Sequence, residues 1–321
     1  KIISMGFKPL LVTYHGNNFY EEGEKNLYNM RKVFNCDHIV FYQNVEVLKK
    51  LNLLAFKMMG DMNWHNHTGI FVYPSKLAAK LNIPIFIYGE TNWDISGMFS
   101  INDFSEYNKR SVLEHDMRGF TVKDFVGKMG LKSNDLDCYD LVSDEEFENK
   151  DLRGLFLGDY VLWDSNHHLD LIKKRYGWIE SKKKFQRTYR RASNLDDMHE
   201  NGVHDYLKWV KFGYGRCSDH ASKDIRMGYL NREKGIKLIK KYDKTVPTAD
   251  LKRWCEYTGL SKDEFFNISD TFRNPRVWKI EDKKWFKYDI DGKIRCYGQT
   301  ALNANQIKNF FSKQKKLKQK L

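Results

Sequence analysis

A run of glycine, cationic and acidic residues in the second half of the chain has the composition of a phosphate-binding segment. Gly213 and Gly215 allow a ligand to approach the backbone closely. The planar guanidinium of Arg216 can bind a phosphate through two hydrogen bonds, and Asp219 is placed to hold Arg226 by an ion pair. We therefore predict an anion site, with a structural ion-pair network as the alternative. The candidate residues are Lys211, Gly213, Gly215, Arg216, Asp219, His220 and Arg226.

Histidine, acidic and aromatic residues supply candidates for proton transfer and for sugar binding. His204 lies beside Asp205, just before the phosphate-binding segment. As a neutral imidazole it could accept a proton, although a core or capping role fits its position equally well. Asp159, Trp163 and Asp164 combine carboxylates with an indole ring on which a sugar can stack. The alternative for these three residues is a helix with one buried face.

Two pairs of histidines resemble metal ligands only superficially. His65 and His67 flank one residue, and His167 precedes His168 directly. No third ligand with suitable spacing accompanies either pair. We therefore predict polar loop residues and no metal site. Cys217 follows Arg216, whose charge would lower the pKa of the thiol, but we do not assign it as a nucleophile.

The elements that must position these residues alternate between two periodicities in the first third of the chain. Apolar runs predict buried strands, and amphipathic stretches between them predict helices. Strand and helix in alternation predict a parallel α/β sheet, whose ligands bind at the carboxyl ends of the strands. Pro74 fits a helix only in its first turn or at a kink. The expected strands are Lys8–Tyr14, Cys36–Tyr42 and Ile83–Tyr88; the expected helices are Tyr20–Phe34, Val45–Met59 and Ile70–Leu81, with a break at Gly60–Gly69.

The remainder of the chain predicts helices followed by a small hairpin. From about Leu152 charged helical stretches dominate, and no buried strand is expected before the hairpin at Trp278–Tyr297, where Asp291-Gly292 is a tight-turn pair. Asn231 is expected to cap a helix that starts at Arg232. Residues 1–7 have the pattern of the last turns of a helix.

Composition excludes several classes of protein. The 321 residues are 41% hydrophobic, which is enough for a core and excludes wholesale disorder. No apolar stretch is long enough to span a membrane. The five cysteines are spread out without a CxxC pair, which indicates a reducing, cytoplasmic setting rather than a disulfide framework. The net charge of +13 attracts anions; the basic cluster at 173–191 is either a solvated helix face or a surface for a polyanion.

Several segments in order resemble the N-acetyl sugar amidotransferase family of the PP-loop ATP pyrophosphatase superfamily. The most specific block is LKWVKFGYGRCSDHASKDIRMGYLNR, at residues 207–232. The other segments are MGFKPLLVT at residues 5–13, NIPIFIYGE at 82–90, LGDYVLWD at 157–164, LSKDEFF at 260–266 and FRNP at 272–275.

The resemblance implies a fold and a reaction. The fold would be a parallel sheet with flanking helices, adenine nucleotide alpha hydrolase-like and of PP-loop type, with a helical C-terminal region. ATP would adenylate the acetamido oxygen of a nucleotide-linked sugar, and ammonia would replace AMP to leave an acetamidino group, in the synthesis of bacterial O-antigen or flagellar glycans. ATP and Mg2+ are the implied cofactors. A glutaminase subunit that supplies ammonia, with a cyclase-like channel subunit, is the implied partner.

The resemblance also implies a domain order and roles for residues. The nucleotide-binding domain would be 1–100, the variable insertion 101–155, the helical substrate region 156–278, and the hairpin with its basic tail 279–321. The family's phosphate loop, SGGxDS, would lie shortly before Lys1, so we expect an N-terminal stretch to be missing. Predicted catalytic residues are Glu90, His204 and Asp164; predicted nucleotide-binding residues are Thr13, Tyr14, His15, Gly89, Asn92, Lys211, Arg216 and Arg226; predicted substrate-binding residues are Asp159, Trp163, Asp219 and His220.

Two other functions remain compatible with the sequence. The first is a PP-loop ATPase that modifies tRNA by thiolation or lysidine formation, which the basic charge favours but the lack of a CxxC pair opposes. The second is a basic nucleic-acid-binding protein without catalytic activity. That reading explains the charge, but it leaves the strands that end in polar glycine loops unexplained.

Overall fold

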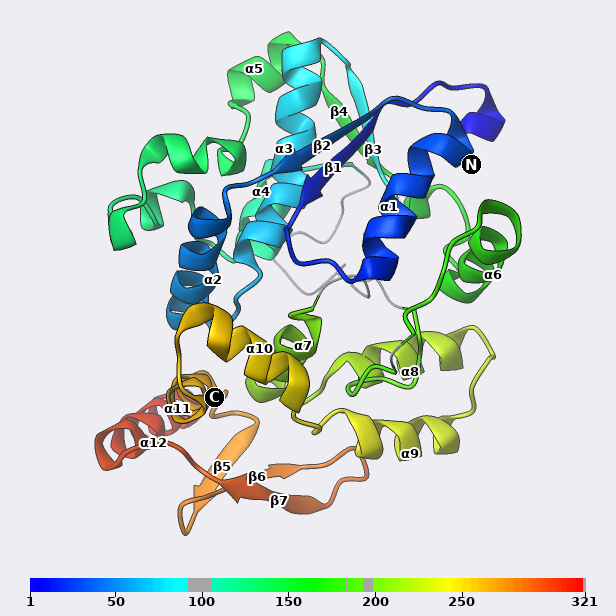
Figure 1. Ribbon diagram of the computed structural model, residues 1–321. Helices are drawn as coiled ribbons and strands as arrows, with labels where there is room; N and C mark the ends of the chain where they lie inside the picture. Colours follow the sequence, from blue (N-terminus) through cyan, green and yellow to red (C-terminus); the bar gives the residue numbers. More distant parts are fainter. Residues whose placement is uncertain (92–105, 183, 193–198, 320–321) are drawn as a thin grey trace. The chain divides into compact units, whose positions relative to one another are not determined.

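The computed structural model describes residues 1–91, 106–182, 184–192 and 199–319, and over these residues the chain is a mixed α/β protein with small sheets (Figure 1). Contacts within the chain divide it into two units. Unit 1 comprises Lys1–Ala55 and Met62–Ile179, and unit 2 comprises Phe56–Asp61 and Glu180–Leu321. Helix α2 (Val45–Met59) therefore begins in unit 1 and ends in unit 2.

Unit 1 contains two pairs of parallel strands. Strand β1 (Leu11–His15) pairs with β2 (His38–Tyr42), and β3 (Ile85–Tyr88) pairs with β4 (Arg153–Phe156). The long helix α3 (Trp64–Leu81) contacts both β1 and β3. The other helices of the unit are α1 (Glu21–Phe34), α4 (Lys109–Ser111), α5 (Asp144–Asn149), α6 (Ser165–Tyr176), the π-helix η3 (Val112–Asp116), and the 3-10 helices η1 (Ile3–Met5), η4 (Val122–Asp124), η5 (Lys128–Gly130), η6 (Ser133–Tyr139) and η7 (Leu157–Asp159).

The core of unit 1 forms around the buried face of α3. Trp64 is fully buried, and its indole nitrogen donates to the carbonyl oxygens of Met117 at 3.0 Å and Phe120 at 3.1 Å. A Cβ atom at Gly69 would lie 2.5 Å from the ring of Tyr14. Strand β1 can therefore lie against α3 only because residue 69 has no side chain.

Unit 2 combines helices with a three-stranded antiparallel sheet in the order β5–β6–β7 (Figure 1). Phe56, at the end of α2, is fully buried and stacks on Phe265 with 5.2 Å between ring centroids. The elements are α7 (Asn201–Phe212), α8 (Arg216–Arg226), α9 (Arg232–Tyr242), α10 (Thr248–Thr258), α11 (Lys262–Thr271), β5 (Trp278–Glu281), β6 (Lys284–Tyr288), β7 (Ile294–Gln299) and α12 (Ala304–Lys318).

A buried cation lies among the aromatic rings of unit 2. The guanidinium carbon of Arg273 is 4.0 Å from the ring centroid of Trp278 and 4.8 Å from that of Trp285. Its Nε donates to Asp270 at 2.7 Å, and the other oxygen of Asp270 accepts the indole N–H of Trp285 at 2.8 Å. The cation is thus held by ring faces and a carboxylate, as a buried charge requires.

Most predicted elements of the first third of the chain are confirmed. The three predicted strands are β1, β2 and β3, each beginning slightly later than expected. The helices predicted at Tyr20–Phe34 and Val45–Met59 are α1 and α2. In unit 2, α9 begins at Arg232 as expected, and the Asn231 side chain caps it by accepting the backbone N–H of Lys234 at 2.9 Å.

The predicted break at Gly60–Gly69 is wrong over most of its length. Helix α3 already begins at Trp64, so Pro74 lies in the helix interior and not in its first turn. Polar residues suggested a loop, yet His65 and Asn66 are buried. Tertiary packing on β1 outweighs the missing proline hydrogen bond and the weak helix propensity of this segment.

The expectation that no strand precedes the C-terminal hairpin is also wrong. Strand β4 has the sequence RGLF and pairs with β3 in parallel register. The sequence did not predict this strand because it begins with an arginine followed by a glycine, and neither residue favours a strand. The parallel pairing is as predicted, but the described strands form two separate two-stranded sheets rather than one sheet.

The C-terminal hairpin is confirmed and extended. Strands β6 and β7 flank the Asp291-Gly292 turn, where Gly292 has a φ of +75°. A second hairpin joins β5 to β6 through Asp282 and Lys283, with φ of +46° and +56°. Neither turn residue is a glycine, so the sequence gives no typical signal for this turn. At the other end of the chain, residues 1–7 were expected to form the last turns of a helix. The structure has a single 3-10 turn there, η1.

Candidate functional site

The carboxyl ends of β3 and β4 bring together two segments predicted separately to be functional. Gly158, after β4, donates its backbone N–H to the carbonyl of Glu90, after β3, at 2.8 Å. Thr91 donates its hydroxyl to Asp159 at 3.0 Å. A Cβ atom at Gly158 would lie 2.5 Å from Thr91 and 2.9 Å from the ring of Trp163. We call Glu90, Thr91, Gly158, Asp159 and Trp163 the β3–β4 cluster.

The other predicted residues near this cluster differ in their surroundings. Glu90 and Gly89 are exposed. Asp164 is buried and caps α6, because it accepts the backbone N–H groups of Asn166 at 3.0 Å and His167 at 3.2 Å. Its carboxylate therefore has a structural task in addition to any catalytic one. Asn92 lies outside the described residues.

At the end of β1, Tyr14 and His15 are buried and Thr13 is half-buried, and each side chain has a partner within the protein. Tyr14 shares hydrogen bonds with Tyr139 at 2.6 Å and with His65 at 3.2 Å, and burial raises its pKa well above 10.0. Thr13 contacts His38 at 2.8 Å. The ring of His15 packs between two aromatic rings, and burial lowers its pKa from 6.5. The side chains of Tyr14 and His15 are therefore engaged with other residues of the protein. The same contacts place His65 in the core and not in the predicted loop.

In unit 2, a buried carboxylate joins two predicted residues of α7. Asp61 lies 3.0 Å from Nδ1 of His204 through one oxygen and 3.6 Å from Nζ of Lys211 through the other. Sequence reasoning named His204 and Lys211 but missed Asp61. No local pattern could have found it, because 143 positions separate Asp61 from His204.

An ion-pair chain runs between α7 and α8. Arg216 donates to Asp205 at 2.9 Å and approaches Asp219 at 3.9 Å. Asp219 also accepts from Lys208 at 2.5 Å. The partners of Asp219 are thus Lys208 and Arg216 rather than Arg226, which donates to Ser222 at 3.3 Å. A phosphate that bound Arg216 would have to share it with Asp205.

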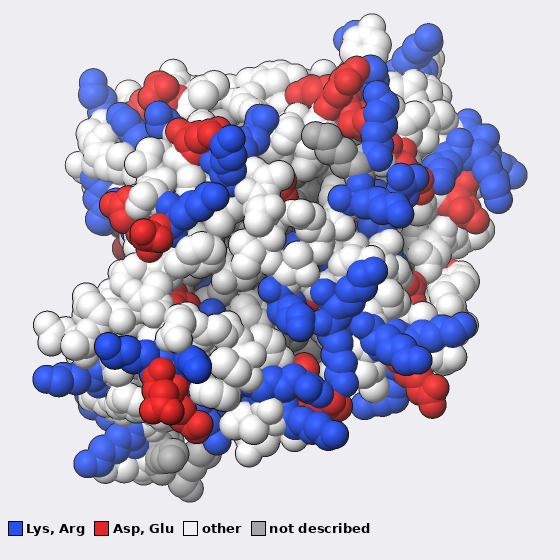
Figure 2. Space-filling model, turned by 60° about the horizontal axis from the view of Figure 1, so that its bottom comes forward, with Lys and Arg blue, Asp and Glu red and all other residues white. Residues whose placement is uncertain are grey.

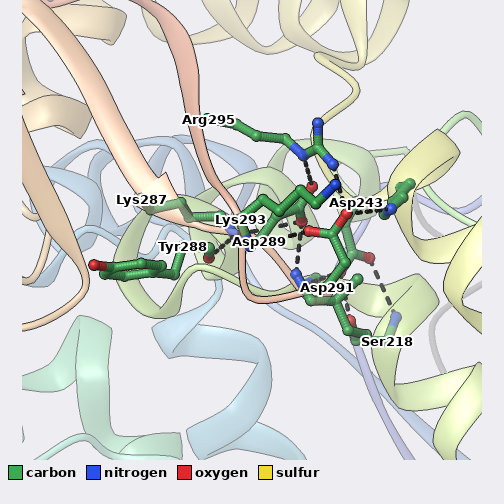
Figure 3. Close-up of polar contacts among 11 residues, drawn as sticks. Ser218, Asp243, Lys287, Tyr288, Asp289, Asp291, Lys293 and Arg295 are labelled. Carbon is green, nitrogen blue, oxygen red and sulfur yellow. Dashed lines mark hydrogen bonds and ion pairs between the residues drawn. The ribbon is translucent and has the colours of Figure 1, made fainter.

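The N-terminus of α8 is already satisfied by a carboxylate of the chain itself. Asp243 accepts the backbone N–H of Gly215 at 2.9 Å, and the backbone N–H and hydroxyl of Ser218 at 3.2 and 2.6 Å (Figure 3). Figure 3 also shows the charged hairpin residues nearby, where Arg295 reaches Asp289 and Asp291. An external anion would therefore compete with Asp243 for these donors.

Two further residues of α8 are buried in ways that fix their protonation. The ring of His220 contacts the Thr188 hydroxyl at 2.6 Å, and burial, aided by the nearby Arg190, lowers its pKa well below 6.5. Burial raises the pKa of Cys217 to about 12. The lowering expected from Arg216 is therefore wrong, and Cys217 is a thiol at neutral pH.

Basic side chains are prominent on the surface. Figure 2 shows Lys and Arg gathered over much of one face, with Asp and Glu interspersed. Such a surface attracts anionic ligands. Exposed basic residues of α8 and α9 include Arg226, Arg232, Lys234, Lys237 and Lys241. Among the described residues, no helix has both the length and the apolar composition needed to cross a bilayer.

Comparison with known proteins finds a family model that resembles part of the chain. Residues 174–290 match the family described as LPS biosynthesis protein WbpG-like, C-terminal domain. The matched segment includes His204, Lys211 and Arg216, together with all of α8. No curated protein matches the chain. The match is consistent with a role in lipopolysaccharide or sugar biosynthesis, and it suggests an enzyme.

Proposed function

We propose that the protein is an ATP-dependent amidotransferase that converts an acetamido group of a nucleotide-activated sugar into an acetamidino group. It would act in the synthesis of bacterial O-antigen or flagellar glycans. The observation that carries the proposal is the match of residues 174–290 to the lipopolysaccharide biosynthesis family. That segment contains the cationic and histidine side chains that such a reaction needs.

The chemistry follows from the poor leaving ability of an amide oxygen. Transfer of AMP from ATP to this oxygen releases pyrophosphate and converts the oxygen into a good leaving group. Ammonia then attacks the activated carbon, and AMP departs. The reaction therefore calls for cations to bind phosphates, a group to accept a proton from the attacking nitrogen, and a surface to hold the sugar.

Residues of unit 2 would serve the first two requirements. Lys211, Arg216 and Arg226 would bind phosphate groups, and the ion pairs of Lys211 with Asp61 and of Arg216 with Asp205 hold two of these cations in place. His204 would accept the proton. Asp219 and His220 would contribute to substrate binding, His220 as a neutral ring because burial lowers its pKa.

The residues of unit 1 would serve the nucleotide and the sugar. The backbone of Thr13–His15 and Gly89 would contact ATP, and Trp163 would stack on the sugar beside Asp159. Glu90 and Asp164 would take part in catalysis. Mg2+ bound with ATP would neutralise charge on the phosphates.

The ammonia would come from a separate glutaminase subunit, because free NH3 is scarce at neutral pH. The sequence has no Gly-x-Cys-x-Gly nucleophile. Cys217 lies among the candidate residues, but it is buried and its pKa is raised. It is therefore unsuited to attack glutamine.

The test uses the protein with ATP, Mg2+, ammonium chloride and a UDP-linked diacetamido sugar. We expect AMP, measured by chromatography, and a sugar product in which mass spectrometry finds an amide oxygen replaced by an NH group. A His204→Gln variant should form far less AMP, and omission of the sugar should abolish AMP formation. AMP release that depends on tRNA instead of sugar would refute the proposal and favour a tRNA-modifying ATPase.

A further inference from the structure

Asp61 is a buried carboxylate whose position is fixed by the turn before it. Gly60 follows α2 with a φ of +65°, and a Cβ atom there would lie 2.7 Å from the ring of Phe272. Only 2% of Asp61 is exposed. The glycine turn therefore directs the carboxylate into unit 2, where a charge is tolerated only if it has partners.

The partners of Asp61 lie on one face of α7. Nδ1 of His204 is 3.0 Å from one carboxylate oxygen, and Nζ of Lys211 is 3.6 Å from the other. The two residues are about two helical turns apart, so their side chains project from the same side of the helix. His204 is itself 8% exposed. The imidazole is thus held at its Nδ1 edge by a carboxylate that a lysine also contacts.

We infer that Asp61 is a positioning residue for His204, an inference that rests on the proposed function because it concerns the proton acceptor of that reaction. A carboxylate can only accept a hydrogen bond, so Nδ1 of the neutral ring must donate, and the lone pair is then on Nε2. Asp61 also keeps the ring oriented while Nε2 takes up a proton. Lys211 places a positive charge beside the same carboxylate.

The step that this arrangement serves balances without any further reactant. Ammonia attacks the carbon of the adenylated amide, and a C–N bond forms. The attacking nitrogen passes a proton to Nε2 of His204. The C–O bond to AMP then breaks, AMP leaves with the electron pair, and His204 returns its proton to solvent.

The first measurement reads the tautomer of His204 directly and needs no activity. Histidine labelled with 15N, assigned with a His204→Gln sample, should show the proton of His204 on Nδ1 in the wild-type chain. In Asp61→Asn the new amide can donate to Nδ1, so the Nε2–H tautomer should gain population. A proton already on Nε2 in the wild-type chain, or the same tautomer in both proteins, would overturn the inference.

The second measurement is the rate of AMP formation. Asp61→Asn should lower kcat by at least about 100-fold, the lower end for a general base, with a small effect on KM. The double variant Asp61→Asn/His204→Gln should be no slower than His204→Gln alone, because two residues that act as one unit do not give additive losses. Losses that multiply in the double variant would overturn the inference.

Asp224→Asn is the matched control for loss of a buried carboxylate. Asp224 is 5% exposed and pairs with Arg190. The control should lower Tm but retain kcat; an equal loss of kcat in both variants would assign the effect of Asp61 to stability alone. If the wild-type chain forms no AMP with any sugar, the proposed function fails, whereas the tautomer measurement still decides the role of Asp61.

Discussion

Burial decides which single residues near the candidate site can exchange protons at neutral pH. Cys217 and His220 lie on the same helix and are both buried, and burial favours the uncharged form of each. His204 is buried as well, but it has a carboxylate partner in Asp61. The segment at residues 207–232 therefore offers fewer groups suited to acid–base catalysis than its sequence suggests.

Cys217 should be inert towards alkylation in the folded protein. Its sulfur is fully buried, and a pKa raised to about 12 leaves almost no thiolate at neutral pH. Iodoacetamide followed by peptide mass spectrometry should modify the exposed Cys296 and leave Cys217 intact until denaturant is added. Rapid modification of Cys217 in the native protein would contradict this assignment.

Arg273→Ala should destabilise unit 2 severely. The substitution leaves the buried carboxylate of Asp270 without its cation and removes the charge that Trp278 and Trp285 enclose. We expect a loss of about 3–5 kcal/mol in the free energy of unfolding, measured by urea titration. Arg276→Ala is the control, because Arg276 is exposed, and it should change stability by no more than about 0.5 kcal/mol.

At the scale of elements, strand β4 determines whether the β3–β4 cluster can form. Its parallel pairing with β3 places Gly158 and Asp159 beside Glu90 and Thr91. The strand itself depends on one small residue. A Cβ atom at Gly154 would lie 2.3 Å from Cβ of Tyr107 and 2.4 Å from the ring of Phe86.

Gly154→Ala should therefore weaken unit 1 through overpacking. We expect a loss of about 1–3 kcal/mol, with lower stability in urea and faster hydrogen exchange in β3 and β4. Gly89→Ala is a suitable control for stability, because no atom of the described residues lies within 4 Å of the added carbon. Equal stability of the two variants would show that β4 tolerates a side chain at position 154.

At the scale of the whole molecule, both units should lose stability as the pH falls below neutral. Burial is the first cause of a pKa lowered from 6.5 in four histidines: His15, His38 and His168 in unit 1, and His220 in unit 2. The unfolded chain then binds more protons than the folded chain once the pH falls through 6.5. The stabilisation is complete above that pH and is lost progressively below it.

The urea midpoint should consequently be lower at about pH 5.5 than at about pH 7.5. His220→Gln should reduce this difference, because the variant cannot take up the proton that His220 resists in the folded state. A midpoint that is the same at both pH values, or a difference unchanged in His220→Gln, would contradict the prediction.

Local signals allowed some of this architecture to be predicted from sequence. The spacing of apolar residues predicted helix α2, and Asn231 was predicted to cap α9. Both signals depend on residues close together in sequence, and both predictions are confirmed. The turn at Asp282-Lys283 lacks a glycine, so its sequence does not indicate a turn. Strand β4 contains a glycine, so its sequence does not indicate a strand. The pairing of Asp61 with His204 depends on tertiary structure alone.

The division of α2 between the two units has a practical consequence for dissecting the protein. A polypeptide starting at Glu180, or one limited to the family match at 174–290, would lack Phe56–Asp61. It would lose the Phe56 ring that stacks on Phe265, and the carboxylate that holds His204. Genetic truncation at the apparent boundary would thus leave the core of unit 2 incomplete.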